Sequence, residues 1–426
     1  MGESPRYRMQ ETIRQYAQDK LLAAGETVEA RNRHLAYFEA KLAEAGPQWR
    51  TDQRSRWLTW VGQEQDNVRL AVEWALATDL EAALALVANL GFYWPQVASS
   101  LEGRRMIARA LAQTEAQPDL WSGDDIEPRR QLLLAGAWFT DGFMANTGGV
   151  NPDIRTSMEK AIALLRPLGE IRQLAVAYGF AGLGALFTGD FQTGLTYGRE
   201  ALALARQAGD PWGVAMQLIT FSMIGAMAGP DGVDALAQWE EGMAIMRDLH
   251  DSWGEAMGHM VAGNAFLLRR DLSLARQHYE QSSRLFSEAN FGYLANIGRN
   301  GLAEIAWRQG DYSRAQTLYP QVINLWRLAD QRGAIARCLE CLGFIAVNQA
   351  RDAAEPLPLL RRAATLFGAA ESIRLTNNSP MHPWERTEYD GYVATLRDML
   401  DPEMFASAWH TGQGMDLDQA VAYATK

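Results

Sequence analysis

Cysteine is nearly absent from this sequence: Cys338 and Cys341 are the only two among 426 residues. Two cysteines exclude a disulfide framework, and their scarcity is typical of proteins that work in a reducing cytoplasm. Residues 1–6 have no apolar core, so we do not expect a signal peptide there. These observations together predict a cytoplasmic protein.

Positive charge is also in short supply. The 40 Lys and Arg residues are outnumbered by 51 Asp and Glu residues, which gives a formal net charge of −11. A surface that binds nucleic acid needs clustered basic side chains. We therefore expect no direct contact with nucleic acid.

Long hydrophobic runs are few, and residues 174–188 and 212–230 are the longest that carry no charge. The first run is short for a membrane span, and the second carries Gln217, Thr220 and Ser222 at the spacing of a repeat helix. We interpret both as buried helices and expect no membrane contact. No run of alternating apolar and β-branched residues is long enough to predict a strand.

What the sequence has instead is a long repeat. Similar phrases begin at residues 210, 251, 290 and 330, and Asp210-Pro-Trp-Gly and Asp251-Ser-Trp-Gly are the clearest of them. A second series lies half a period away and consists of Asp190, Asp231, Asp271, Asp311 and Asp352. A period of about 40 residues, divided into halves of about 20, is the signature of helical hairpins that stack into a solenoid. We expect six antiparallel helix pairs over residues 130–372.

The ends of the predicted helices are marked by turn and cap residues. Gly or Arg precedes the half-period Asp, as in Gly189-Asp190, Arg270-Asp271 and Gly310-Asp311. The first residue of each pair suits the left-handed conformation that ends a helix, and the Asp caps the next helix. The other junction reuses the same cap, at Asp210, Asp251 and Asp330.

Breaker residues indicate how the chain is divided. Residues 117–128 are polar and rich in Pro, Gly and Asp, and they separate an N-terminal helical region, 1–116, from the solenoid, 130–372. Residues 373–426 are expected to cap the solenoid with two helices, 384–400 and 402–424.

One repeat resembles the tetratricopeptide pattern, in which Gly-Asp-Tyr precedes an Ala and then an aromatic residue on the second helix. Here the residues are Gly310-Asp-Tyr312, Ala315 and Tyr319. The resemblance implies an all-α fold: a right-handed superhelical solenoid of tetratricopeptide-like helix-turn-helix repeats. The period near 40 implies helices longer than those of the common 34-residue form.

A second resemblance covers nearly the whole chain. The motifs at its start are Tyr7-Arg-Met-Gln-Glu-Thr-Ile-Arg-Gln-Tyr16, Arg33-His-Leu-Ala-Tyr-Phe38, Glu64-Gln-Asp-Asn-Val-Arg-Leu-Ala-Val-Glu-Trp-Ala75 and Glu102-Gly-Arg-Arg105. Those at its end are Ala364-Thr-Leu-Phe-Gly-Ala-Ala-Glu371, Arg386, Tyr389, Phe405-Ala-Ser-Ala-Trp409 and Asp418-Gln-Ala-Val-Ala-Tyr423. In combination they resemble the tetratricopeptide-like helical sensor arm of bacterial STAND-class (LuxR-type, MalT-like) ATPase transcriptional regulators.

This resemblance implies a function in signal transduction. In such regulators an effector or partner protein on the arm relieves inhibition of the attached ATPase module, and a LuxR-type DNA-binding domain often follows. No ATPase module precedes Tyr7 and no helix-turn-helix follows Ala424. We therefore expect the chain to correspond to the arm alone, with the ATPase module of the same regulator as a partner.

Glycine-rich loops, cysteine pairs and histidines form functional sites in many proteins, but in this sequence we interpret them as structural. Gly179-Phe-Ala-Gly-Leu-Gly184 lacks the preceding strand of a phosphate loop, and Cys338-Leu-Glu-Cys341 lies in the middle of a predicted helix. The six His residues show no metal-ligand spacing. We expect no cofactor, no metal and no catalytic residues, and hence no enzyme.

The concave side of a tetratricopeptide solenoid is formed by the first helix of each hairpin, and helical geometry selects the residues that face inward. The inward set predicted from the repeats is Met216, Met223, Met257, Met260, Asn264, Asn300, Glu304, Trp307, Arg308, Arg337 and Glu340, with Met227 and Leu267 beside them. This predicts an exposed groove that is apolar and Met-rich in its middle and polar toward the C-terminal repeats. Met is common at surfaces that accept varied partners.

Two functions fit such a groove. The first is a sensor arm that binds a small-molecule, protein or peptide effector, and it predicts a closed, apolar concavity. The alternative is a tetratricopeptide protein–protein interaction scaffold that holds a peptide or helix in an open groove with a polar rim. An enzyme is the remote third alternative.

Overall fold

The computed structural model describes residues 9–51, 53–94, 100–123, 126–145, 153–228, 234–289, 291–328 and 331–426. The N-terminal helices are α1 (Glu11–Ala24), α2 (Thr27–Ala45), the 3-10 helix η1 (Gly46–Arg50), α3 (Arg54–Gln63), α4 (Gln65–Thr78), α5 (Leu80–Leu90), α6 (Ser100–Glu115) and α7 (Pro118–Trp121). The chain ends with α20 (Pro383–Met399), α21 (Pro402–Gln413) and α22 (Leu417–Ala424).

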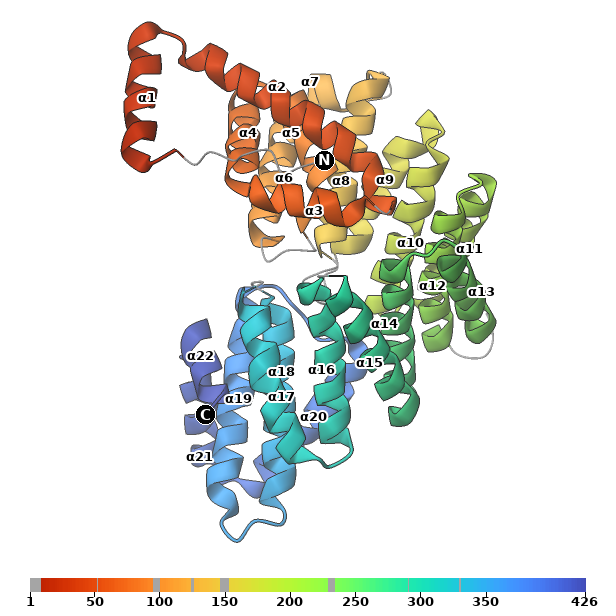
Figure 1. Cartoon of the computed structure of the whole chain (residues 1–426). Helices are drawn as coiled ribbons and strands as arrows, with labels where there is room; N and C mark the ends of the chain where they lie inside the picture. Colours follow the sequence, from red (N-terminus) through yellow and green to blue (C-terminus); the bar gives the residue numbers. More distant parts are fainter. Residues whose placement is uncertain are drawn as a thin grey trace.

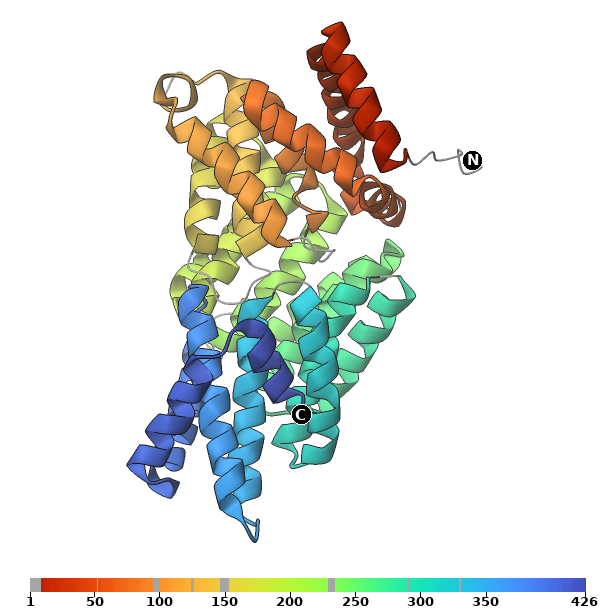
Figure 2. The same ribbon diagram turned by 90° about the vertical axis from the view of Figure 1, so that its left-hand side faces the viewer.

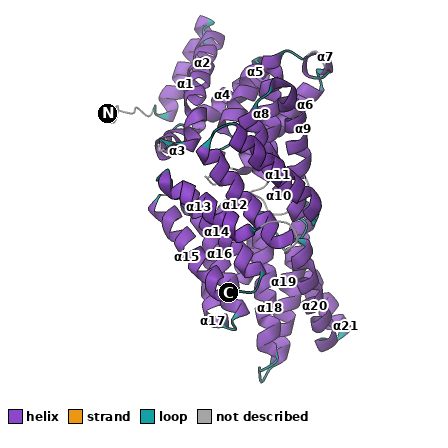
Figure 3. Cartoon of the chain, turned by 90° about the vertical axis from the view of Figure 1, so that its right-hand side faces the viewer, coloured by secondary structure: helices purple, strands orange, loops and turns teal. Residues whose placement is uncertain are grey.

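Six helical hairpins lie between these two regions. They are α8 (Pro128–Ala145) with α9 (Asp153–Leu168), α10 (Ile171–Phe187) with α11 (Phe191–Gln207), α12 (Pro211–Ala228) with α13 (Ala235–Asp248), α14 (Ser252–Leu268) with α15 (Leu272–Glu288), α16 (Gly292–Arg308) with α17 (Tyr312–Leu328), and α18 (Arg332–Ala350) with α19 (Pro356–Thr376). No strand occurs in the described ranges (Figure 3). The predicted all-α solenoid is therefore confirmed.

The hairpins form a curved array. The N-terminal helices and first hairpins lie at one end, α10–α15 follow along one side, and α16–α22 form the other end (Figures 1 and 2). The first helices of successive hairpins contact one another, as α10, α12, α14 and α16 do. These helices, which were predicted to line the concave side, thus form a continuous layer.

The half-period aspartates begin the second helices of their hairpins, because each side chain accepts a backbone N–H of the first helical turn. The pairs are Asp190 with Thr193, Asp271 with Leu274 and Asp311 with Arg314, at N···O distances of 3.2, 3.1 and 3.1 Å. The preceding Gly189, Arg270 and Gly310 have φ of 84°, 63° and 79°. These turns therefore have the left-handed residue and the Asp cap that the sequence predicts.

Two of the predicted caps fall outside the described residues, and one prediction was wrong. Asp231 and Asp330 are not among the described residues, and Asp234 caps α13. Asp352 lies in the turn before α19, which begins only at Pro356. Proline favours the first helical position, since its fixed φ suits a helix and its missing N–H needs no partner there.

The hydrophobic core crosses the boundary predicted at residues 117–128. Leu134 and Met144 of α8 belong to the same buried cluster as Leu42 of α2 and Leu84 of α5. The helices before the boundary therefore pack against the first hairpin and share its core.

The C-terminal region differs from the two predicted capping helices. Residues 402–424 form α21 and α22, because Asp416 begins a new helix by accepting the backbone N–H of Gln419 at 2.8 Å. Helix α20 also does more than close the end of the solenoid. Its Glu388 reaches Arg308 of α16 and Arg337 of α18, so α20 lies against the concave side of the last hairpins.

Helix α12 is the one helix in the described ranges that is long and apolar enough to cross a membrane, judged by length and composition only. Of the 18 residues of this helix, 56% are buried inside the protein. It packs against α10, α11, α13 and α14, as expected of a buried repeat helix.

Candidate ligand-binding cavity

A cavity of about 710 Å³ lies on the concave side of the solenoid. Its walls come from η1, α5 and α8 at the N-terminal end, from α10, α12, α14 and α16 in the middle, and from α18 and α20 at the C-terminal end. Segments from nearly the whole chain therefore line one space.

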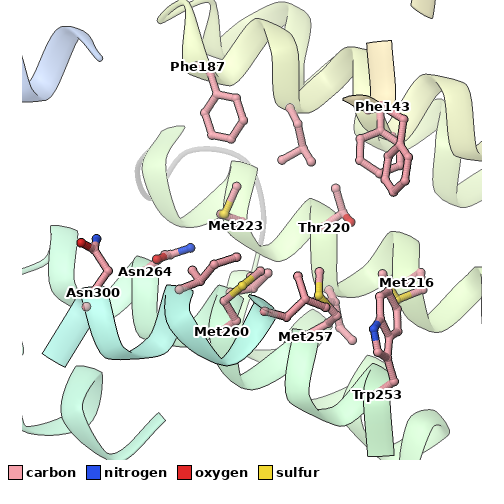
Figure 4. Close-up of a pocket in the computed structure, with 18 of the residues that line it drawn as sticks. Phe143, Phe187, Met216, Thr220, Met223, Trp253, Met257, Met260, Asn264 and Asn300 are labelled. Atoms are coloured by element: carbon pink, nitrogen blue, oxygen red, sulfur yellow. The ribbon is translucent and has the colours of Figure 1, made fainter. Parts of the chain in front are cut away.

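Most of the groove residues predicted from the repeats line this cavity. They are Met216, Met223, Met257, Met260, Asn264, Asn300, Glu304, Arg308 and Arg337, together with Met227 and Leu267. Figure 4 shows the methionines of α12 and α14 on facing sides, with Asn264 and Asn300 together at one end. The predicted order, apolar in the middle and polar toward the C-terminal repeats, is the order that the cavity has.

Two residues of the predicted set do not line the cavity. Trp307 is buried between helices, where its ring lies 5.6 Å from that of Phe344 and 6.4 Å from that of Tyr392. Glu340 is fully buried and binds Arg374 with N···O distances of 2.6 and 3.0 Å. Both side chains support the packing of the last hairpin.

The cavity also has an aromatic wall that was not predicted. Phe139 and Phe143 on α8, and Phe180 and Phe187 on α10, occupy inward positions of the first two hairpins. Phe187 stands three residues before Asp190, as Arg308 stands three residues before Asp311, so the phase of the predicted set would have found it. The other four aromatic residues of the wall are Trp49 of η1, Phe92 two residues after the end of α5, and Trp212 and Trp253 of the Trp-Gly phrases.

The aromatic rings of this wall form a connected series. Ring centroids are 6.0 Å apart for Phe139 and Phe143, 6.2 Å for Phe143 and Phe92, 5.5 Å for Phe92 and Trp253, and 6.3 Å for Trp253 and Trp212. Contacts of this kind fix the shape of the wall, since each ring is held by its neighbours.

Uncharged polar groups interrupt the apolar lining at a few points. Gln217 and Thr220 come from α12, Asn264 from α14 and Asn300 from α16. Asn264 Oδ1 accepts a hydrogen bond from the Tyr279 hydroxyl at 2.7 Å, and Asn300 Oδ1 accepts one from the Cys338 thiol at 3.4 Å. Both asparagines are thus held by buried neighbours.

Paired charges fill the C-terminal end of the cavity. Glu304 accepts hydrogen bonds from Arg308 and Arg337, with shortest N···O distances of 2.6 and 3.2 Å. Glu388 of α20 accepts two from Arg308, at 2.8 and 2.9 Å. Glu385 lies 3.3 Å from Arg337. The predicted exposed polar edge is therefore covered by the protein's own α20.

The carboxylates of this network remain ionised. Burial acts to raise the pKa of Glu304, but Arg337 and Arg308 outweigh it and hold that pKa below its usual value. The same balance, with Arg337 opposing burial, lowers the pKa of Glu385. Buried charges are tolerated because each one has a partner of opposite sign.

Near the N-terminal end of the cavity, two arginines reach the Asp-x-Trp-Gly phrases. Arg50 binds Asp210 at 3.2 Å, and its guanidinium lies 5.3 Å from the Trp212 ring. Arg54 binds Asp251, and its guanidinium lies 4.7 Å from the Trp253 ring. The repeated phrase thus forms two Asp–Trp sockets, each of which holds one arginine of the N-terminal region.

No family model matches the chain, and no curated protein matches it. Solved structures with a low degree of likeness include the following three. A Rap protein complexed with competence and sporulation factor is 14% identical, with a TM-score of 0.40 over 74% of this chain and 100% of that one. A STAND protein with a tetratricopeptide repeat sensor from Pyrococcus horikoshii is 14% identical, with a TM-score of 0.42 over 88% of this chain and 55% of that one. Yeast Tom70 is 11% identical, with a TM-score of 0.36 over 92% of this chain and 99% of that one. Likeness at this level carries no information on function.

Proposed function

We propose that the chain is the effector-binding sensor arm of a signal-transducing regulator of transcription, a soluble cytoplasmic module without catalytic activity. The observation that carries the proposal is the 710 Å³ cavity, whose volume lies within the range of about 300–1,000 Å³ that small-molecule sites have. The regulator part of the proposal is supported by sequence motifs that resemble those of STAND-class regulators, including Glu64–Ala75 and Ala364–Glu371.

The composition of the lining fits a small effector. Apolar side chains, with phenylalanine, tryptophan and methionine prominent among them, supply most of the wall, a few uncharged polar groups interrupt it, and charged side chains lie at its ends. This is the usual composition of ligand pockets, in which the apolar wall provides affinity and the polar groups fix orientation. Met216, Met223, Met257 and Met260 add adaptability, because an unbranched thioether side chain can fit ligands of several shapes.

The sockets at the N-terminal end offer a route by which binding is signalled. Trp212 and Trp253 line the cavity and also contact Arg50 and Arg54 of the N-terminal region. A ligand that packs on these rings can shift the two Trp side chains. Because Trp212 and Trp253 contact Arg50 and Arg54, such a shift would move η1 and α3. A ligand shifts a conformational equilibrium only if it binds the two arrangements with different affinity. We propose that the sockets are the element whose two arrangements differ.

The alternative function, a scaffold that holds a partner peptide or helix, has less support. The concave side of α16 and α18 already holds a helix of the same chain, because Glu388 of α20 pairs with Arg308 and Arg337 there. A partner helix at this place must first displace α20. The remaining concave space is the apolar cavity.

The binding step is tested with a neutral fluorescent dye such as Nile red. Thr220→Trp and Met260→Trp each put a large ring into the cavity, and both variants are expected to lose dye uptake while their melting temperature stays near that of the parent. Leu375→Trp, at a side chain that is 74% exposed, is the control and should bind dye normally. Unchanged uptake by both cavity variants would rule out the cavity as the binding site.

The signalling step is tested separately by hydrogen exchange. Dye binding should change the exchange rates of backbone amides in η1 and α3, which carry the two socket arginines. Exchange that changes only in α12 and α14 would contradict the signalling step and leave the binding step standing.

A further inference from the structure

We infer that the cavity selects uncharged, largely apolar molecules that carry a carbonyl-type hydrogen-bond acceptor at one end, a ligand class that rests on the proposed binding function. The acceptor end lies at Asn264 and Asn300, and the apolar body extends toward Phe143 and Trp253. Figure 4 shows these two pairs at opposite ends of the cavity.

The orientation of Asn264 is set by a buried tyrosine. Tyr279 is 1% exposed, and its hydroxyl donates to Asn264 Oδ1 at 2.7 Å. Burial, with the nearby Glu304 charge, raises the pKa of Tyr279, so this hydroxyl keeps its proton and acts as a donor. With its oxygen turned toward the Tyr279 hydroxyl, Asn264 directs its NH₂ group to the cavity.

Asn300 is oriented in the same way by a thiol. Cys338 is fully buried, and its Sγ donates to Asn300 Oδ1 at 3.4 Å. Burial, reinforced by the nearby Cys341, raises the pKa of the Cys338 thiol and preserves the S–H donor. Two neighbouring helices, α14 and α16, therefore each direct a side-chain N–H donor into the space. A ligand that meets both donors needs an acceptor oxygen.

Gln217 provides a second, independent indication of a ligand. Its side chain lines the cavity, is 5% exposed, and makes no hydrogen bond to any residue that the structure describes. It lies against Gly179, where a Cβ atom would come within 2.1 Å of Gln217 Oε1. A glycine at this position leaves room for the amide. Buried amides normally have partners, so a polar group on a ligand is the partner that Gln217 fits.

The absence of net charge follows from the pairing of the charged lining. Arg50 is bound by Asp210, Arg270 by Glu388, Arg308 by Glu304 and Glu388, and Arg337 by Glu304. A ligand carboxylate or ammonium would enter an apolar space whose counter-charges are already engaged. Transfer of an unpaired charge into such surroundings is strongly unfavourable. The cavity therefore discriminates against charged analogues of the same shape.

The experiment compares three probes with one naphthalene body and different heads: naphthaleneacetamide, naphthaleneacetate and naphthaleneethylamine. Each displaces Nile red from the full chain at neutral pH. The amide is expected to bind about tenfold or more tightly than either ion. In Asn264→Leu the amide should lose about tenfold in affinity, whereas methylnaphthalene, which has no acceptor, should bind as in the parent. Asn67→Leu, at an exposed asparagine, is the matched control.

The outcomes separate this inference from the proposed function. Equal or tighter binding of the acetate or the ethylamine would overturn the ligand class while dye uptake by the cavity still stands. An amide affinity unchanged in Asn264→Leu would overturn the assignment of the acceptor end. If the cavity takes up no dye at all, the proposed function itself is wrong.

Discussion

The guanidinium of Arg54 donates two parallel hydrogen bonds to the carboxylate of Asp251, 197 residues further along the chain, with N···O distances of 3.0 and 3.1 Å. The indole N–H of Trp212 donates to the same carboxylate at 2.6 Å. Both charged side chains are largely buried, 6% exposed for Arg54 and 14% for Asp251. One carboxylate thus joins the N-terminal region to the hairpins that form the centre of the cavity.

Removing one partner of this pair should destabilise the fold strongly. Arg54→Met leaves the Asp251 carboxylate buried without its main partner, and we expect a loss of about 3 kcal/mol or more in the free energy of unfolding. Arg206→Met, which removes one partner of the exposed pair Arg206–Glu241, should cost less than about 1 kcal/mol. Chemical denaturation measures both. If the two variants lose the same stability, the Arg54–Asp251 pair does not hold the N-terminal region in place.

The stability that the Arg54–Asp251 pair contributes should decrease at acidic pH. Burial alone would raise the pKa of Asp251, but hydrogen bonds from Arg54 and Trp212 and the Arg54 charge bring it below its usual value. A carboxylate with a lowered folded-state pKa stabilises the fold above its unfolded pKa, and this stabilisation is lost as pH falls through the folded value. Asp251→Asn should therefore reduce the difference in stability between neutral and strongly acidic pH.

Glu388 should hold α20 in its place on the solenoid. Because Glu388 binds Arg308 in bidentate fashion and also reaches Arg337, Glu388→Gln is expected to loosen α20. Faster hydrogen exchange throughout α20 and a lower melting temperature are the expected results. Asp390→Asn on the same helix removes only the exposed pair with Arg386 and should leave both quantities nearly unchanged. Equal effects of the two substitutions would contradict this role of Glu388.

A pair of histidines outside the cavity should make the protein sensitive to acid. His259 and His278 face each other with Nδ1 atoms 2.9 Å apart, and the Trp239 ring contacts both. Burial, reinforced by His278, Arg247 and Arg284, lowers the pKa of His259 to about 4, and burial lowers that of His278 as well. The unfolded chain therefore binds more protons than the folded chain between pH 6.5 and about 4.

Stability should accordingly fall as pH drops from about 6.5 to about 4. His259→Gln removes the titrating ring and should flatten this part of the profile, whereas the exposed His410→Gln should not. Unfolding free energies measured at several pH values give the slopes. A parent slope that persists in His259→Gln would assign the acid sensitivity to other groups.

The order of the hairpins could be predicted because their signals are local. Each half-period Asp acts on the turn in which it stands, as Asp190, Asp271 and Asp311 do, so position in the sequence is enough to find them. The predicted helix 402–424 is divided because α21 ends at Gln413 and Asp416 caps a new helix, α22. Gly414 and Asp416 are local signals of this break, but the prediction did not use them.

The cavity could be predicted only in part, because only some of its lining residues are determined by local sequence signals. Helical phase places Met257, Met260 and Asn264 on one face of α14, and that phase can be read from the sequence. The contributions of Phe92 and of Glu388 depend on where distant segments come to lie, and no local pattern encodes that. The Trp-Gly phrases were found as markers of the repeat, yet their role as arginine sockets needs the partner 197 residues away.

Asn300 and Glu304, neighbours on the polar side of α16, should respond in opposite ways to replacement by Ala. Sequence periodicity alone treats both as exposed groove residues whose loss leaves stability unchanged. Among the described residues, the Asn300 side chain makes only the long bond from the Cys338 thiol, whereas Glu304 binds Arg308 and Arg337 inside the network. Asn300→Ala is therefore expected to cost about 0.5 kcal/mol or less and to weaken binding of an acceptor-bearing ligand.

Glu304→Ala removes a buried counter-charge from two arginines, of which Arg337 is only 8% exposed. Hydrogen bonds to charged groups contribute about 1.5–3 kcal/mol each, so we expect a loss of about 3 kcal/mol and a melting temperature several degrees lower. Glu304→Gln keeps the shape and removes the charge, and it should recover only part of the loss. Melting temperature and probe affinity are measured on all three variants. A stable Glu304→Ala protein would show that Glu385 and Glu388 alone neutralise the arginines, and an Asn300→Ala protein as unstable as Glu304→Ala would remove Asn300 from the ligand-facing set.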